Sequence, residues 1–138
     1  MAEIQQRRGF GRGTGGVARW TAVVALVGAL AGAAGAAAAA ATVAEMDSLL
    51  SALGSSGCRF QRNGTWYDAD QAVAHLRKKR AWLEKHDKIR RTEDFIRLGA
   101  TESSMSGKPY TMACPGKPTV ESRLWLEARL AALRSKPR

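Results

Sequence analysis

His75 is the ionisable residue of most chemical interest, because one turn of helix would place it beside Lys79. For nucleophilic catalysis it would need a serine hydroxyl from the segment 103–106, and a carboxylate such as Asp68 or Asp70 to orient its ring. A lone histidine is more often structural. An envelope hydrolase built on His75 and a nearby serine is therefore an alternative that depends on how the fold brings these segments together.

The segment 103–110 shares a Gly107-Lys108 pair with phosphate-binding loops, but the rest of that pattern is missing. The preceding glycine lies too far back for GxxxxGK spacing, and Pro109 occupies the place of the metal-binding Ser or Thr. Met105, three residues before Lys108, also breaks a Ser-x-x-Lys acyl-transfer motif. The sequence predicts instead a turn whose serine hydroxyls bond the backbone, and it predicts no cofactor and no catalytic residue.

Cys58 and Cys114 are the two cysteines of the chain. A zinc site would need more ligands, and neither CxxC spacing nor a neighbouring histidine supplies them, so no metal is predicted. In an oxidising compartment an even pair in a small chain indicates a disulfide. In the chain-entropy model, closing a loop of this length stabilises a domain by about 4 kcal/mol.

The first 44 residues have the layout of an export signal. Their apolar stretch from Trp20 to Ala41 ends in small residues that suit cleavage after Ala41 or Ala44, and we favour Ala44. Four arginines precede or enter this stretch: Arg7, Arg8, Arg12 and Arg19. The adjacent pair suits a twin-arginine route, and an ordinary basic segment accounts for it nearly as well.

An uncleaved membrane anchor is the alternative, because about 20 apolar residues can span a bilayer as a helix. Alanine gains much less than leucine on transfer into lipid, which favours cleavage. Cleavage after Ala44 would leave a single exported domain of 94 residues from the 138 of the chain. In the uncleaved form the protein would be a membrane-tethered structural protein, and this segment would be its contact with the membrane.

The exported part is strongly basic. The chain has a formal charge of +10, and the first 44 residues hold four arginines and one acidic residue, so the remainder carries about +7. Much of this charge lies in 77–80 and at Lys85, Lys88, Arg90 and Arg91. Export and the lack of a groove-reading motif argue against nucleic acid as a partner. The remaining partners are an anionic envelope component, such as a lipid head group, or an acidic protein.

Periodicity and turn signals predict a mainly helical α+β domain. Asn63-Gly64 predicts a hairpin over about 58–67, because this pair accepts the positive φ of a type I′ turn. A short strand over about 110–114 should pair with this hairpin and bring Cys114 near Cys58. Helices are expected over 46–53, from the cap Asp68 to about Lys85, from Thr92 onward, and from about Val120 to Arg134 with Thr119 as the cap.

Four motifs in order carry a resemblance to a known family. They are Phe60 with Arg62-Asn63-Gly64, the segment 72–77 with Lys79, the segment 92–96, and the segment 103–110. Together they resemble the YfeK-like proteins, which are small exported bacterial proteins of unknown function. The resemblance covers nearly all of the exported part. It implies a periplasmic domain and implies no reaction, cofactor or catalytic residue.

The sequence therefore favours a small non-catalytic binding or interaction module of the periplasm, with a basic surface. The residues expected to bind come from the motifs above: Arg62, Asn63, His75, Lys79, Ser106 and Lys108.

Overall fold

The computed structural model describes residues 21–137, and their side chains from residue 32 onward. The chain divides into two compact units between Gly35 and Ala36, and the second unit contains the hydrophobic core. The expected export features at Arg7, Arg8, Arg12 and Arg19 lie outside the described residues.

Helix α1 runs without interruption from Thr21 to Gly54. The separate helix expected over 46–53 is therefore the C-terminal end of a longer one, because the alanine-rich residues before it are strong helix formers and no breaker separates them. The part Gly32–Gly54 is long and apolar enough to cross a membrane by length and composition, a test that signal sequences and buried core helices also pass. Its last turns bury Met46, Leu49, Leu50 and Leu53 in the domain.

Four short strands form one antiparallel sheet in the order β2-β1-β3-β4. They are β1 (Arg59–Arg62), β2 (Thr65–Tyr67), β3 (Thr111–Ala113) and β4 (Val120–Glu121). The hairpin of β1 and β2, and the pairing of β3 with β1, confirm the hairpin and the short strand predicted from the sequence. Asn63 and Gly64 have φ values of 49° and 81°, as a turn of this kind requires. The strand β4 was not expected, because its two residues are too short to show a period.

Three further helices complete the fold: α2 (Ala69–Lys85), α3 (Thr92–Gly99) and α4 (Ser122–Arg134). The Asp68 cap is confirmed, since its carboxylate accepts from the Gln71 amide at 2.8 Å and the Gln71 side chain accepts from the Asp68 amide at 3.0 Å. Thr119 does not cap α4. The residues after it pair with β3 first, so the helix begins two residues later than expected, with Glu121 at its N-cap.

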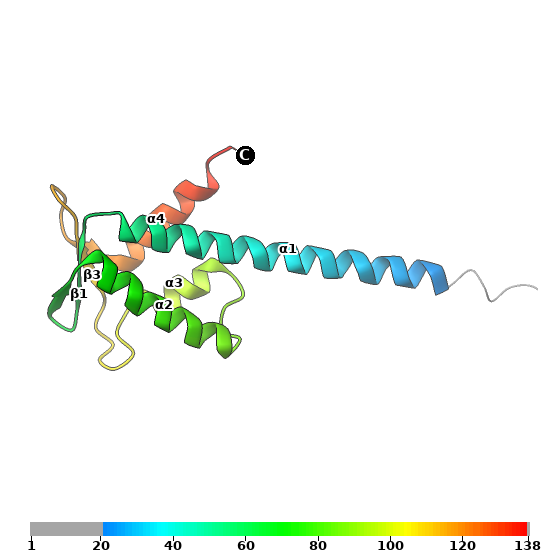
Figure 1. Cartoon of the computed structure of the whole chain (residues 1–138), viewed down its shortest axis with the longest axis horizontal. Coiled ribbons are helices and arrows are strands. Elements are labelled where there is room, and N and C mark those ends of the chain that lie inside the picture. Colours follow the sequence, from blue (N-terminus) through cyan, green and yellow to red (C-terminus); the bar gives the residue numbers. More distant parts are fainter. Residues whose placement is uncertain (1–20, 138) are drawn as a thin grey trace, which may run out of the picture. The chain divides into compact units, whose positions relative to one another are not determined.

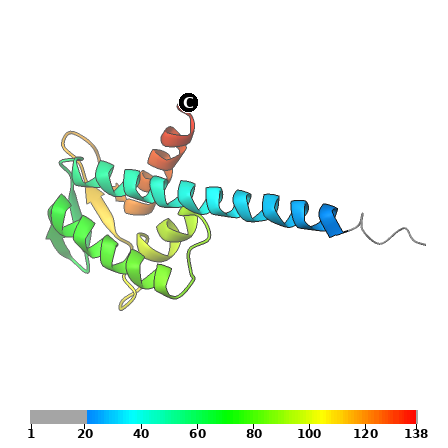
Figure 2. The ribbon, with the colours of Figure 1, turned by 45° about the vertical axis from the view of Figure 1, so that its right-hand side comes forward.

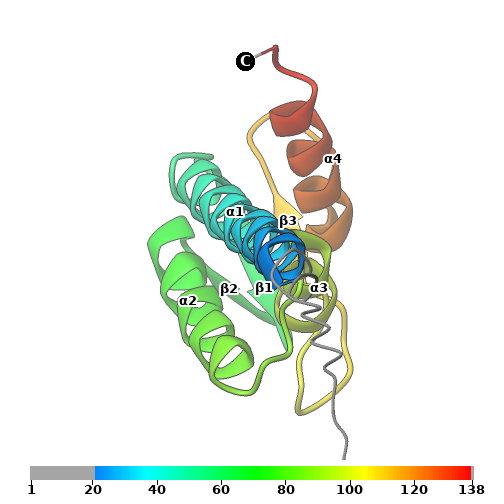
Figure 3. The ribbon, with the colours of Figure 1, turned by 90° about the vertical axis from the view of Figure 1, so that its right-hand side faces the viewer.

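The helices pack around the C-terminal part of α1, which lies between α2 and α4 in the second unit (Figures 1 and 3). Helix α2 crosses one face of the sheet (Figure 2). Helix α4 contributes Leu126 and Leu130 to the core, whereas Leu124 is 49% exposed. Not all of the leucines of α4 therefore face the core.

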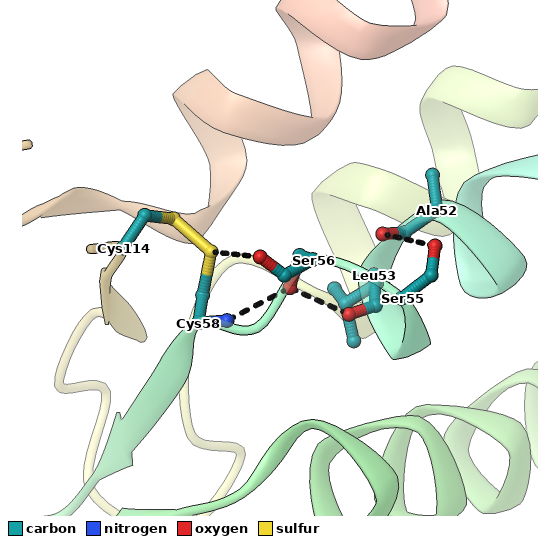
Figure 4. The surroundings of a disulfide bond; sticks show 6 residues. All are labelled: Ala52, Leu53, Ser55, Ser56, Cys58 and Cys114. Atoms are coloured by element: carbon teal, nitrogen blue, oxygen red, sulfur yellow. Dashed lines mark hydrogen bonds between the residues drawn. A yellow bond between two sulfur atoms is a disulfide. The ribbon is translucent and has the colours of Figure 1, made fainter. Parts of the chain in front are cut away.

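A disulfide joins Cys58, just before β1, to Cys114, just after β3 (Figure 4). The predicted pairing is confirmed, and it follows from the register, which places Arg59 opposite Ala113. Ser56 orders the approach from α1 to β1, because its hydroxyl donates to the Leu53 carbonyl at 2.7 Å and accepts from the Cys58 amide at 3.2 Å.

Candidate functional site

Arg62, His75, Lys79 and Tyr110 form one hydrogen-bonded group, which we call the cation cluster. Arg62 ends β1, His75 and Lys79 lie one turn apart on α2, and Tyr110 precedes β3. Arg62 Nη1 lies 3.0 Å from His75 Nδ1, and His75 Nε2 lies 3.1 Å from the Tyr110 hydroxyl. Lys79 Nζ donates to the same hydroxyl at 3.3 Å and to the Glu102 carbonyl at 3.1 Å. The pairing of β1 with β3 brings these residues together.

Donor and acceptor roles in the cluster follow from its chemistry. Arg62 can only donate, and its Nη1 lies 3.0 Å from Nδ1 and 3.3 Å from Nε2 of His75, so the shorter distance favours Nδ1 as the acceptor that carries no proton. A neutral His75 then carries its proton on Nε2 and donates to the Tyr110 oxygen, which also accepts from Lys79. Since both of these bonds point toward the Tyr110 oxygen, its own hydrogen is left to donate to a further group.

Burial and neighbouring cations keep His75 neutral. Burial, followed by the charges of Arg62 and Lys79, lowers the pKa of His75 below 6.5. Burial also lowers the pKa of Lys79, against the opposing effect of Glu102. Burial raises the pKa of Tyr110, which is therefore a neutral phenol at neutral pH. The charged members of the cluster are Arg62 and Lys79.

Neither of these cations is held by a carboxylate. The ion pairs within 4.0 Å among the described residues do not include Arg62 or Lys79. Their contacts are neutral acceptors and aromatic rings: Arg62 lies 5.3 Å from the centre of the Tyr67 ring, and Lys79 lies 5.1 Å from that of Tyr110. The cluster therefore presents two half-buried positive charges that no carboxylate contacts within 4.0 Å, with Glu102 acting on Lys79 only from a greater distance, and this suits an anionic group.

The other residues expected to bind form a separate contact. Ser106 Oγ donates to Asn63 Oδ1 at 2.5 Å, and Asn63 Nδ2 donates to Ser103 Oγ at 3.2 Å. These bonds tie the turn between β1 and β2 to the loop 103–108. The loop is closed by the Ser103 amide, which donates to the Lys108 carbonyl at 3.0 Å. Asn63 and Ser106 therefore hold the loop in place, and the Lys108 side chain is exposed.

The arrangement needed for serine catalysis is not formed by the described contacts of His75, which are to Arg62 and Tyr110. Ser103 and Ser106 bond Asn63, and Asp68 caps α2. Among the described residues, the partners of the two His75 nitrogens are Arg62 and Tyr110 and not a serine. Within residues 32–137, no three His, Cys, Asp or Glu side chains gather closely enough to hold a metal ion.

A pocket of about 330 Å³ opens beside the cation cluster. Its solvent end carries Arg62, Tyr67 and His75, whose side chains are half-buried. Its interior is lined by Leu53, Phe60, Leu76, Ala100 and Ser122, all of them buried. Pockets that bind small molecules are typically about 300–1,000 Å³ with mostly apolar walls and a few polar groups, and this pocket has that character.

The basic run 77–80 does not lie wholly on the outer face of α2. Arg80 is half-buried and pairs with Asp47 at 2.6 Å and with Glu84 at 2.7 Å. Lys79 reaches the cation cluster, while Arg77 and Lys78 are exposed. Two of the four residues, Lys79 and Arg80, therefore make specific contacts. The positive charge exposed on the surface of α2 is smaller than the sequence indicates.

Tyr110 joins Arg62, His75 and Lys79, although its place in the sequence predicts only the start of a strand. The signal for its inward side chain is its position two residues before the buried Met112, on the same face of the strand. The pocket wall, with Ala100 and Ser122, was also missed. It is made by residues far apart in the sequence, which meet only in the folded domain.

Comparison with known proteins identifies the family. Residues 40–134 match DUF5329, a family of unknown function, and the chain belongs to this family. Neither the curated proteins nor the solved structures gave a match to this chain.

Proposed function

We propose that this member of the DUF5329 family is a small exported binding domain that holds an anionic group at the cation cluster. The observation that carries this proposal is the pairing of Arg62 and Lys79 with neutral acceptors only. The charges of Arg62 and Lys79 repel each other, and the Glu102 carboxylate that opposes this effect on Lys79 makes no ion pair with it within 4.0 Å. A bound anion would relieve the repulsion while accepting charge-assisted hydrogen bonds.

The proposed ligand belongs to the bacterial envelope. The disulfide and the apolar N-terminal helix fit an exported protein, and the resemblance to YfeK-like proteins supports the periplasm as its location. Anionic groups on envelope components and on acidic proteins are the partners that a basic periplasmic domain would meet.

Binding of small anions by NMR tests this proposal. Acetate and methyl phosphate are titrated separately against the disulfide-bonded protein, in the form that its host accumulates. We expect saturable shifts of the His75 ring and Tyr110 signals, and an affinity that falls as NaCl is raised. Lys79→Met should weaken binding at least tenfold, because it removes one of the two charges.

Lys88→Met is the matched control, because Lys88 is exposed and lies in the loop after α2. It removes the same charge from the surface and should leave anion binding within about twofold of wild type, as expected for a distant and screened charge. Equal losses in the two variants would reduce the effect to net charge, and the absence of saturable shifts with either anion would overturn the proposed site.

We propose further that the segment 1–44 is removed on export by cleavage after Ala44. The last turns of α1 are committed to the domain core, so the part of the apolar segment available to a membrane or to the export machinery lies before Glu45. Glu45 itself contacts Arg134 of α4, and this contact supports a cleavage point at the edge of the folded domain.

Mass spectrometry of the protein purified from its native host tests the cleavage. A mature N-terminus at Glu45, or at Thr42 if cleavage follows Ala41, supports export with removal of the signal. A chain that retains residues 1–41 and sediments with membranes would instead establish the membrane-tethered form.

A further inference from the structure

The pocket beside the cation cluster is polar at one end and apolar at the other. Its solvent end carries Arg62 and His75, whereas its interior is formed by side chains that are almost fully buried, such as Leu53 (0% exposed) and Leu76 (5%). The division of the pocket therefore matches a molecule with an anionic head and an apolar body.

Ser122 provides a second observation from inside the same pocket. It is 4% exposed, lines the pocket, and its hydroxyl has no hydrogen-bond partner among the described residues. A buried hydroxyl without a partner is unfavourable, and natural proteins keep few of them. A molecule in the pocket with a polar atom at this wall, whether a ligand or a water, would satisfy this hydroxyl.

The size of the pocket limits the length of the ligand. If a methylene group takes about the ~30 Å³ that a water molecule occupies in the liquid, 330 Å³ holds roughly ten such groups. We propose that the pocket binds a single-chain anionic amphiphile with an acyl or alkyl chain of about eight to ten carbons, with its carboxylate or phosphate at Arg62, the cation of the cluster that lines the pocket. This inference rests on the proposed function, because Arg62 belongs to the cluster that holds the anion.

Calorimetric titration with a chain-length series tests the inference. The probes are acetate, hexanoate, octanoate, decanoate and dodecanoate below their micellar concentrations, with decyl phosphate as the second head group and decanol as the uncharged control. The affinity should rise about fourfold for each added methylene, the value expected for transfer of one buried CH₂ from water. The rise should stop once the pocket is filled, near decanoate.

Ala74 offers a way to block the pocket without changing the core, because it lines the pocket and is exposed on α2. Ala74→Phe should weaken decanoate binding at least tenfold with an unchanged Tm and an unchanged affinity for acetate. Ala81→Phe is the matched control, since Ala81 is exposed on the same helix and does not line the pocket. It should bind decanoate as the wild type does.

The possible outcomes separate this inference from the proposed function. An affinity independent of chain length, with binding of acetate that needs Lys79, would overturn the amphiphile and keep the anion site. Equal binding of decanoate and decanol, unaffected by Lys79→Met, would overturn the anion site. Preference for decyl phosphate over decanoate, or the reverse, identifies the head group. No binding by any probe would overturn both.

Discussion

At the residue scale, His75 lies between two permanent positive charges and remains uncharged. Its Nδ1 accepts from Arg62, and its Nε2 is left to orient the Tyr110 hydroxyl. A protonated ring could not accept from Arg62 and would add a third cation to the cluster. Residue type alone suggests that His75 is a general base, whereas its neighbours make it a neutral bridge between the sheet and α2.

Stability should therefore depend on the protonation of His75. Its pKa is lower in the folded than in the unfolded protein, so the unfolded state takes up the proton first as the pH falls below about 6.5. The domain consequently loses stability between pH 7.5 and 5. Arg62, Lys78 and Lys79 face the ring, and each opposes its protonation. We expect the drop in Tm between these pH values to be smaller in His75→Gln than in wild type.

Thermal unfolding followed by circular dichroism at pH 7.5 and 5 measures this drop. His86→Gln is the control, because His86 is exposed at the end of α2 and its ring stacks on Trp82 at 4.1 Å, away from the cluster. The drop in Tm between the two pH values is compared between variants, so that any destabilisation by the substitution itself, which is present at both pH values, cancels. An equal drop in wild type and His75→Gln would show that this histidine is not the group that titrates.

At the element scale, the sequence predicts correctly those features whose conformation is determined by a short segment of the chain. The Asp68 cap and the Asn63-Gly64 turn are set by residues within four positions of each other, and both were predicted from the sequence. The start of α4 was not predicted correctly, because pairing of Val120 with Met112 overrides the cap at Thr119. The cation cluster was found in part, because its helical pair lies one turn apart while Arg62 and Tyr110 join it only through the sheet.

The hairpin turn should be intolerant of a side chain at Gly64. This residue has a φ of 81°, so an added Cβ is strained even though nothing lies within 4 Å of it. We expect Gly64→Ala to destabilise the domain by about 1 kcal/mol, the usual penalty for a left-handed alanine. Gly54→Ala is the matched change, since its Cβ would meet Val73 at an ordinary 3.5 Å in the last turn of α1.

Urea denaturation of both variants measures this difference. Gly54→Ala should be neutral or stabilising by up to about 1 kcal/mol, because alanine is the better helix former. Gly64→Ala should therefore lower the free energy of unfolding and Gly54→Ala should not, although both substitutions add the same methyl group. Equal free energies of unfolding for both variants would mean that the turn is free to relax.

At the scale of the whole molecule, covalent and ionic links compensate for a small core. The disulfide joins residues 56 positions apart and fixes β1 to β3. Domains of this size are marginally stable, typically by about 5–15 kcal/mol. The cation cluster is assembled from α2 and from residues in or next to the same two strands. Loss of a single link such as the disulfide can therefore unfold the domain and with it the cluster.

Removal of the disulfide should cost about 4 kcal/mol in the chain-entropy model. The double variant Cys58→Ala/Cys114→Ala should show this loss in urea unfolding, and reduction of the wild type should give a similar value. Thiol counting under denaturing, non-reducing conditions should find no free cysteine in the native protein. Two free thiols, or a loss below about 1 kcal/mol, would contradict the stabilising role of the bridge.

Arg134 connects three helices near the end of the chain. Its guanidinium on α4 pairs with Glu45 of α1 at 2.7 Å and with Glu93 of α3 at 2.6 Å. These hydrogen bonds to Arg134 are the main reason why the pKa values of Glu45 and Glu93 fall below 4.5. Because both carboxylates have lower pKa values in the folded state, their contribution to stability is present above about pH 4.5 and is lost as the pH falls further.

Arg134→Met should therefore destabilise the protein at pH 7 and less at pH 3, because the contribution of the two carboxylates declines as the pH falls below about 4.5. Urea unfolding at the two pH values measures the change. Arg123→Met is the control, because Arg123 pairs with Glu127 within α4 and such exposed pairs contribute about 0.3–0.5 kcal/mol. In the proposed mature form Glu45 is the first residue, so Arg134 would hold the new N-terminus against α4. A difference between wild type and Arg134→Met that does not depend on pH would show that Arg134 acts through its aliphatic contacts, and that the N-terminus is not held by charge.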